Sequence, residues 1–298
     1  SEKRKQESAT WKLYASLWPV MSGVPYKQVT EYMDKLRAVT KADVQRVAKR
    51  YLDTDAYVVV YKHNGENKDL PKMKKPQITP IDINRDELSP LAQKLVNANV
   101  EPIEPQFVNF ETDFTRVEQD GREFLYRKNK ENDLFTLYYL VEMGKRQNEM
   151  LPFAVDYWEY LAPEGMTPEA YKQKMFALAC NSGVYVSGRQ VYVYLNGPQR
   201  SFAEALRLFM DKLRNPQPNE EALENLKADI KKEREDSKKS KYMILQRGLR
   251  NLAAYGKQNP FNSTLNNEAI DQLDSEALLD AMKSLLKYEH SVMYYGPG

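Results

Sequence analysis

The chain has 298 residues, and its 42% of hydrophobic residues are enough to bury a sizeable core. Its 44 Lys and Arg residues almost balance 42 Asp and Glu residues, which leaves a net charge of +2 and no overall field that favours nucleic acid or an anionic membrane. No apolar run approaches the roughly 20 residues that a membrane-spanning helix needs. The single cysteine, Cys180, excludes an internal disulfide and a cysteine-rich zinc site. It sits among apolar residues of an expected helix, where we expect a buried thiol.

The two ends of the chain resemble cut points inside a longer polypeptide. The N-terminus has no starting Met and lacks the apolar stretch of a signal peptide, and the C-terminal Gly296-Pro297-Gly298 comes directly after a strand-like run. A secretion signal could lie upstream of such a cut. The compartment therefore stays open between the periplasm and the cytoplasm.

The most informative feature is an internal repeat. Residues 36–62 and residues 270–296 align at one fixed offset without a gap. Thr40 in the first segment and Asp274 in the second are both helix N-cap types, and apolar residues follow each of them at steps of three and four, as one buried helix face requires. A β-rich run closes each segment. This match in cap, buried face and exit strand predicts two copies of one domain.

The sequence before each copy sets the expected domain boundaries. Too little sequence precedes the first copy for a whole unit, so we expect residues 1–66 to be the C-terminal part of a preceding homologous domain. Residues 107–298 are expected to be a complete α+β domain. Between them, residues 67–106 are rich in proline among charged residues, a composition that favours extended chain over regular structure. Only residues 89–97 are expected to form a short helix in this linker.

Local patterns predict the elements in chain order. Asp120-Gly121 is a hairpin turn signal, and Thr167 followed by Pro168 is a helix start. Alternating apolar and polar residues predict strands, whereas apolar residues at steps of three and four predict helices. The expected strands are 57–61, 110–117, 123–127, 135–143, 183–187, 190–196 and 291–295, and the expected helices after the linker are 148–162, 167–181, 202–214, 219–237, 242–255 and 268–286. Strands at the start, middle and end with helices between them predict an α+β layer.

This order of elements resembles one domain of the pitrilysin/insulinase family of zinc metallopeptidases. In that family a strand ends in Gly before an acidic residue and an active-site helix, which match Gly144, Glu149 and residues 153–161 here. A Gly-bearing hairpin and an edge strand follow, as at residues 183–194. The resemblance implies an antiparallel-rich sheet with packed helices, in the duplicated, metalloprocessing-peptidase-like arrangement.

The resemblance also locates the family's inverted zinc motif, H-x-x-E-H, in which two histidines bind zinc and the Glu activates a metal-bound water. The equivalent residues here run from Asp156 to Tyr160, so that Glu159 survives and both histidines are replaced. The family's third ligand, a Glu, falls on Asp229. These changes predict a degenerate motif, with no catalytic residue, no metal and no cofactor in this chain. Zinc is expected only in the full-length parent protein.

Several residues have a structural interpretation. We expect Tyr157, Trp158 and Tyr160 to fill the core in place of a metal site. The interleaved charges of residues 227–241 predict a solvated helix face with ion pairs four residues apart. The only histidines, His63 and His290, have no His or Cys nearby in sequence and are expected to be exposed or structural.

The favoured hypothesis is that this chain is the non-catalytic middle segment of a zinc metalloendopeptidase and helps to close a peptide-degrading chamber. Its partner would then be a peptide or unfolded polypeptide substrate, bound by residues that the sequence does not identify. The proline-rich linker would act as a hinge between two halves. Two alternatives stay open: a catalytically dead peptidase-like scaffold, and an independent module that binds extended peptides.

Overall fold

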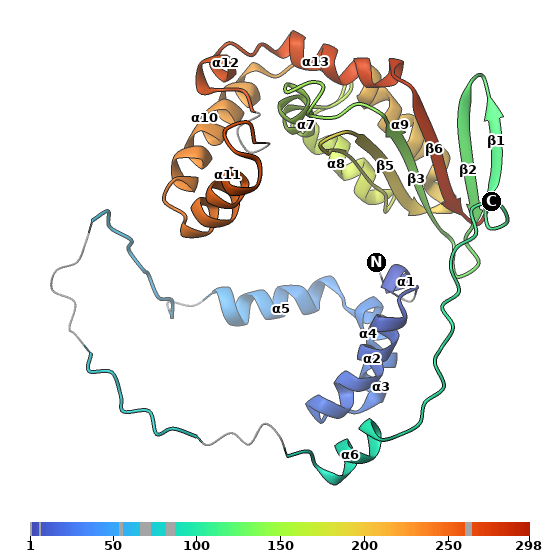
Figure 1. Ribbon diagram of the computed structural model, residues 1–298, viewed down its shortest axis with the longest axis vertical. Helices are drawn as coiled ribbons and strands as arrows, with labels where there is room; N and C mark the ends of the chain where they lie inside the picture. The colour runs from blue at the N-terminus through green and yellow to red at the C-terminus, as the bar shows by residue number, and fades with distance from the viewer. Residues whose placement is uncertain (1, 6, 54–55, 66–72, 82–86, 260–263) are drawn as a thin grey trace. The chain divides into compact units, whose positions relative to one another are not determined.

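The computed structural model describes residues 2–5, 7–53, 56–65, 73–81, 87–259 and 264–298. The chain divides into two compact units, the first made of Ser1–Ala9 with Val108–Gly298 and the second of Thr10–Phe107. Figure 1 shows the first unit as a twisted sheet with helices beside it, whereas the second consists of helices joined by extended chain.

The first unit is built on one six-stranded sheet with the strand order β1-β2-β6-β3-β5-β4. The strands are β1 (Thr115–Gln119), β2 (Arg122–Lys128), β3 (Leu134–Val141), β4 (Asn181–Val186), β5 (Val191–Pro198) and β6 (His290–Gly296). All described pairings are antiparallel except that of β2 with β6, which is parallel. The predicted α+β class with an antiparallel-rich sheet is confirmed.

The turn between β1 and β2 has the chemistry of a tight hairpin. Asp120 and Gly121 both adopt positive φ angles, 53° and 70°. Two successive residues with positive φ match the strand twist, and Asp-Gly accommodates them at low cost. The predicted hairpin at this dipeptide is confirmed.

One face of the sheet carries the hydrophobic core. In β5 the residues Val191, Val193 and Leu195 are buried, while the alternate residues Tyr192 and Tyr194 are only partly buried. The buried face packs against helices α7 (Leu151–Glu159), α9 (Phe202–Arg214) and α13 (Ser275–Ser284). The alternation of period two thus places one layer of helices on one side of the sheet.

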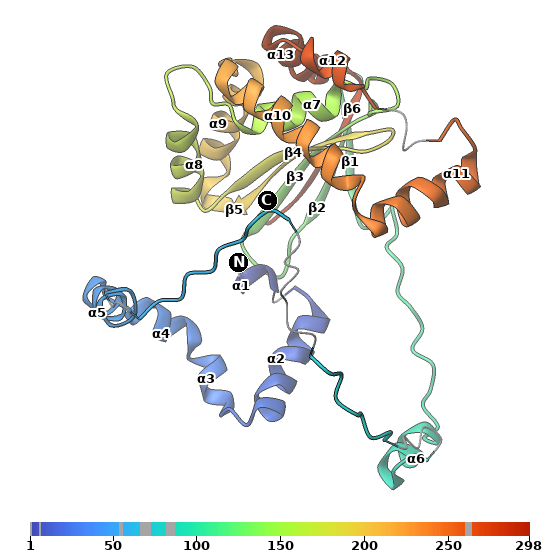
Figure 2. The ribbon, with the colours of Figure 1, turned by 90° about the vertical axis from the view of Figure 1, so that its left-hand side faces the viewer.

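This unit has several further helices. Thr167 caps the predicted proline-initiated helix α8 (Pro168–Ala177), and Asn219 caps the long helix α10 (Glu220–Ser237). Figure 2 shows α10 crossing α7, with which it is in contact. The others are α1 (Glu2–Lys5), the π-helical segment Met243–Leu249, α11 (Arg250–Tyr255), α12 (Asn267–Asp271) and two 3-10 turns, Gln199–Ser201 and Leu285–Lys287.

The second unit has helices but almost no core. Its helices are α2 (Ala9–Ser22), α3 (Tyr26–Thr30), α4 (Tyr32–Ala38), α5 (Lys41–Leu52) and α6 (Pro90–Val96). Among its described residues only Pro19 is buried. The predicted N-cap Thr40 forms a capping box with Asp43, and the predicted short helix after Ser89 is present as α6. No described helix of either unit is long and apolar enough to cross a bilayer.

Two strand predictions need correction. Residues 57–61 are extended, but no described strand pairs with them and their side chains are exposed. A β-rich sequence becomes a strand only when another strand supplies its hydrogen-bond partners, and β6 has such partners in β2 and β3. Residues 110–114 also lie outside the sheet, because Asn109 and Asp113 close a turn before β1: the Asp113 amide donates to the Asn109 carbonyl at 2.9 Å.

Other boundaries differ for local reasons. The single helix predicted over residues 268–286 is broken into α12 and α13, because Asp274 caps α13 by accepting from the Ala277 amide at 2.8 Å. Cys180 is buried, as predicted, yet it lies after α8 rather than inside it. The predicted charged face begins with Lys227, which is in fact buried and donates to Glu224 at 2.8 Å, three residues away rather than four.

Candidate functional site

Helix α7 carries the positions where the family resemblance places the zinc motif. The helix starts with a proline in its first turn and ends at Glu159, so Tyr160 is its C-cap residue. Its apolar face is buried by Leu151, Phe153, Ala154, Val155, Tyr157 and Trp158. Asp156, Glu159 and Tyr160 are exposed. The core prediction is therefore confirmed for Tyr157 and Trp158 and is wrong for Tyr160, which is 48% exposed.

Asp156 lies among other acidic groups. Asp156 is exposed, yet the neighbouring side chains partly desolvate its carboxyl, and this raises the pKa of Asp156. The negative charges of Glu159 on α7 and Glu233 on α10 raise it further. The α10 acid that acts on Asp156 is thus Glu233, which lies one turn after Asp229. The sequence predicted Glu233 only as part of the solvated charged face of residues 227–241 and gave it no role near the motif.

Two hydrogen bonds connect α7 to the start of α10. The Tyr157 hydroxyl accepts from the Asn219 amide at 2.8 Å and donates to the Asn219 carbonyl at 3.2 Å. The Asn219 side chain in turn accepts from the Ala222 amide at 3.0 Å and caps α10. The buried phenol of Tyr157 therefore sets where α10 begins relative to α7, and α10 carries the exposed Asp229.

The residues at the motif positions do not fit a catalytic zinc ion. Such a site takes imidazole nitrogens and a carboxylate in tetrahedral geometry. Asp156 and Asp229 offer carboxylates, Tyr160 offers an exposed phenol, and neither 156 nor 160 supplies an imidazole. Within the described ranges, no group of three His, Cys, Asp or Glu side chains is arranged to hold a metal ion. No reaction step through zinc follows from these residues.

A buried cation lies behind the motif. Lys212 on α9 is only 3% exposed, and its ammonium nitrogen lies 3.8 Å from the ring centre of Trp158 and 4.9 Å from that of Tyr171. The Trp158 indole N–H donates to the Lys212 carbonyl at 3.2 Å. Desolvation lowers the pKa of Lys212 to about 8; the charge of Glu159 raises it in part and that of Lys172 lowers it. The charge of the surviving motif glutamate, Glu159, therefore raises the pKa of a buried lysine.

Lys212 also borders a cavity of about 310 Å³, together with Trp158, Glu159, Tyr171 and Cys180. Burial raises the pKa of the Cys180 thiol to about 11, which keeps it unreactive. The sequence signal for Lys212 was its place on the apolar face of α9, where Ala205, Phe209 and Leu213 are buried at steps of four. A lysine in such a stripe is rarely buried without a partner.

The two histidines lie in different units. His63 is exposed in the second unit, where its ring stacks on that of Tyr61 at 6.4 Å. His290 begins β6, and its Nδ1 is 2.8 Å from the Tyr288 carbonyl oxygen. Because a carbonyl oxygen only accepts, Nδ1 carries a proton. Its ring meets that of Tyr139 edge-on at 5.9 Å.

Comparison with solved structures identifies the fold. A peptidase M16 inactive domain from Pseudomonas fluorescens matches 62% of this chain with a TM-score of 0.52 and 15% identity. The ferredoxin protease FusC, solved as a point mutant in complex with Arabidopsis ferredoxin, matches 97% of this chain with a TM-score of 0.52 and 12% identity. The periplasmic protease PqqL from Escherichia coli matches 96% of it with a TM-score of 0.50 and 13% identity.

This chain is shorter than these proteins: the matches cover 47%, 34% and 31% of their respective lengths. No protein-family model matches the sequence, and no curated protein matches it. At 12–15% identity the likeness concerns the fold. The similar structures include two proteins described as proteases and a domain described as inactive. The sheet and helices of residues 108–298 thus have the fold of an M16-type peptidase domain, as the resemblance to the pitrilysin/insulinase proteins predicted.

Proposed function

We propose that this chain is the non-catalytic middle segment of an M16-type zinc metalloendopeptidase and that residues 107–298 help to enclose its peptide substrate. The observation that carries the proposal is a peptidase-domain fold whose motif helix presents Asp156 and Tyr160 where a zinc site needs imidazole. In this role the domain supplies wall and binding surface, and another part of the parent protein supplies the zinc.

The proposal also assigns the domain boundaries. Residues 1–66 belong to the end of a homologous domain, residues 67–106 link the two, and residues 107–298 form the degenerate copy. The exposed apolar residues of the second unit support this division. Val44 and Val47 of α5 are 59% and 45% exposed, whereas Leu278, at the repeat position equivalent to Val44, is fully buried in α13. A helix face of this kind is stable only when it packs on the rest of its own domain.

Zinc content and peptide cleavage test the proposal. The purified chain, dialysed against zinc and washed, is expected to hold far less than one zinc ion per chain in an elemental assay and to leave a fluorogenic peptide uncut. A separately purified segment from directly upstream, expected to carry H-x-x-E-H, is expected to hold zinc and to cut the peptide faster once this chain is added. The matched control adds the chain with Tyr157→Ala, in which the α7–α10 connection is lost.

Three outcomes contradict the proposal. One is stoichiometric zinc with peptide cleavage by this chain alone, which would make it an enzyme. Another is an upstream segment without H-x-x-E-H, which would favour a peptidase-like scaffold. A third is an upstream zinc segment whose rate of cleavage does not change on addition of the chain, which would make this domain irrelevant to substrate.

A further inference from the structure

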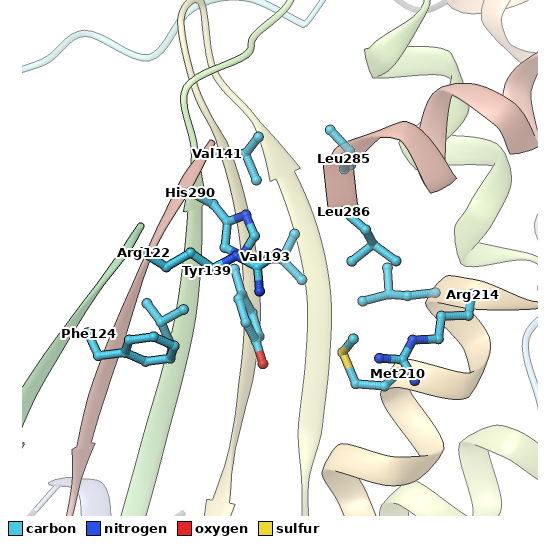
Figure 3. A pocket seen from close by; sticks show the side chains of 12 residues that line it. Arg122, Phe124, Tyr139, Val141, Val193, Met210, Arg214, Leu285, Leu286 and His290 are labelled. Carbon is cyan, nitrogen blue, oxygen red and sulfur yellow. The ribbon is translucent and has the colours of Figure 1, made fainter. Parts of the chain in front are cut away.

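An apolar pocket of about 360 Å³ lies between the helix-covered face of the sheet on one side and helix α9 with the 3-10 turn Leu285–Lys287 on the other. Figure 3 shows its two walls, with Tyr139 and Val193 on the sheet side and Met210 and Leu286 on the helix side. Leu213 and Val292 also line it and are buried. A pocket of this volume is at the lower end of the range for small-molecule sites.

The rim of this pocket is cationic. Arg122 on β2 and Arg214 at the end of α9 approach it from opposite sides, with Tyr139 between them (Figure 3). Both arginines are exposed, and neither guanidinium forms an ion pair or hydrogen bond with a residue in the described part of the chain. Other described arginines do form such pairs, for example Arg116 with Glu123 at 3.0 Å. Arg122 and Arg214 are therefore free to receive an anion.

The positive charge of the rim affects the pKa of Tyr139, whose phenol lines the pocket. Burial raises the pKa of the Tyr139 phenol, and the nearby positive charge of Arg214 partly lowers it again. Tyr139 therefore stays a neutral hydrogen-bond donor beside a cation. The His290 ring, whose Nδ1 is held by the Tyr288 carbonyl, packs on Tyr139 and fixes its position. An arginine with a phenol donor beside an apolar cavity is complementary to a carboxylate attached to an apolar group.

We infer that this pocket binds the C-terminal residue of a peptide, with its apolar side chain inside and its α-carboxylate at the rim formed by Arg122, Tyr139 and Arg214. The inference rests on the proposed function, because only a domain that contacts peptides would meet such a ligand. It adds a preference for a free C-terminus with an apolar last residue. The arginine fork suits the two carboxylate oxygens, and the cavity has room for an apolar side chain.

The test measures binding of one fluorescently labelled peptide ending in Leu, as the free acid and as the C-terminal amide, to the full chain by anisotropy. The free acid is expected to bind about tenfold or more tightly than the amide, since a charge-assisted pair is lost in the amide. Arg214→Gln and Arg122→Gln are each expected to reduce this preference, and the double variant to abolish it. Arg127→Gln is the matched control, because Arg127 lies on the same strand as Arg122 and lines the opposite side of the sheet.

Each outcome decides a separate point. Equal binding of acid and amide overturns the pocket inference while leaving the chain a peptide binder, so the proposed function survives. No binding of either form by the chain, with no effect of the chain on cleavage by the zinc segment, overturns both. Binding of octanoate that depends on Arg214, without any binding of the peptide acid, overturns the peptide source and assigns the pocket to a fatty acid. A preference that Arg127→Gln reduces as much as Arg214→Gln does overturns the assignment to this rim.

Discussion

The ammonium of Lys212 lies 3.8 Å from the ring centre of Trp158, so a buried cation on α9 packs on the residue that precedes the surviving motif glutamate, Glu159. A protonated lysine at 3% exposure loses most of its hydration, which the indole and phenol faces replace only in part. The imbalance is what lowers the pKa of Lys212 to about 8.

This relationship predicts a pH dependence of stability. The pKa of Lys212 is about 8 in the folded chain and about 10.4 in an unfolded one. Below pH 8 both states hold the proton; above it the folded state releases the proton first, so the unfolded state binds more protons and stability rises with pH. Relative to Lys212→Met, the free energy of unfolding of the wild type is expected to increase by about 1 kcal/mol from pH 7.5 to pH 9.

Urea unfolding of both proteins at each pH measures this difference. The contributions of the titratable groups that both proteins share then cancel. Lys174→Met on α8 serves as the control, because Lys174 is exposed and its removal should leave the slope of the wild type unchanged. If the difference in the free energy of unfolding between the wild type and Lys212→Met stays flat or falls over this pH range, Lys212 is not a desolvated cation.

A second prediction concerns the connection between α7 and α10. Tyr157→Phe removes the hydroxyl that accepts from the Asn219 amide at 2.8 Å and donates to its carbonyl at 3.2 Å. The partly buried backbone amide and carbonyl of Asn219 then lose their hydrogen-bond partner, so the free energy of unfolding is expected to fall by roughly 1–3 kcal/mol. Thermal or urea unfolding measures it. Tyr160→Phe, which changes an exposed phenol one position after α7, is expected to alter stability by less than about 0.5 kcal/mol; equal effects of the two would refute the role of the Tyr157 hydroxyl.

A third prediction concerns the linker. Its described residues 73–81 and 97–106 are exposed and have no helix or strand, so a protease can bind them in extended form. Brief trypsin digestion is expected to cut first between residues 64 and 106 and to leave a resistant fragment that contains residues 108–298. Mass spectrometry of the fragments locates the cuts. First cuts within β3 or α9, or resistance of the whole linker, would contradict its assignment as an interdomain hinge.

The local elements were predictable where sequence alone decides the structure. Helix α9 has the bounds that its apolar periodicity predicted, Phe202–Arg214, because its stripe fits one helix face. The strand predicted over residues 57–61 was wrong because a strand depends on partner strands, which the local sequence does not contain. The residues at the motif positions were named from the resemblance, whereas Lys212, Glu233 and the pocket rim were missed. Their chemistry comes from contacts between residues more than 50 positions apart, such as Trp158 with Lys212, and no spacing rule reports those.

The last prediction concerns Gly144, the glycine that follows β3 and that the family resemblance singled out. A Cβ atom at this position would lie 2.5 Å from the Arg189 carbonyl carbon and 2.6 Å from the Gln190 amide nitrogen, both of them backbone atoms of the β4–β5 turn. In the same turn, the Ser187 carbonyl oxygen accepts a hydrogen bond from the Lys145 amide at 3.0 Å. This bond holds the two segments together.

Backbone atoms cannot rotate away as side-chain ends do, so Gly144→Ala is expected to push the turn off β3 and to lower the free energy of unfolding by about 1–3 kcal/mol. Gly183→Ala is the matched control, because its Cβ would meet only the far end of the Tyr194 side chain, at 2.7 Å from the hydroxyl, and that ring can shift. Chemical denaturation of both variants gives the comparison. If Gly183→Ala costs as much as Gly144→Ala, then close approach of the backbone is not what requires glycine after β3.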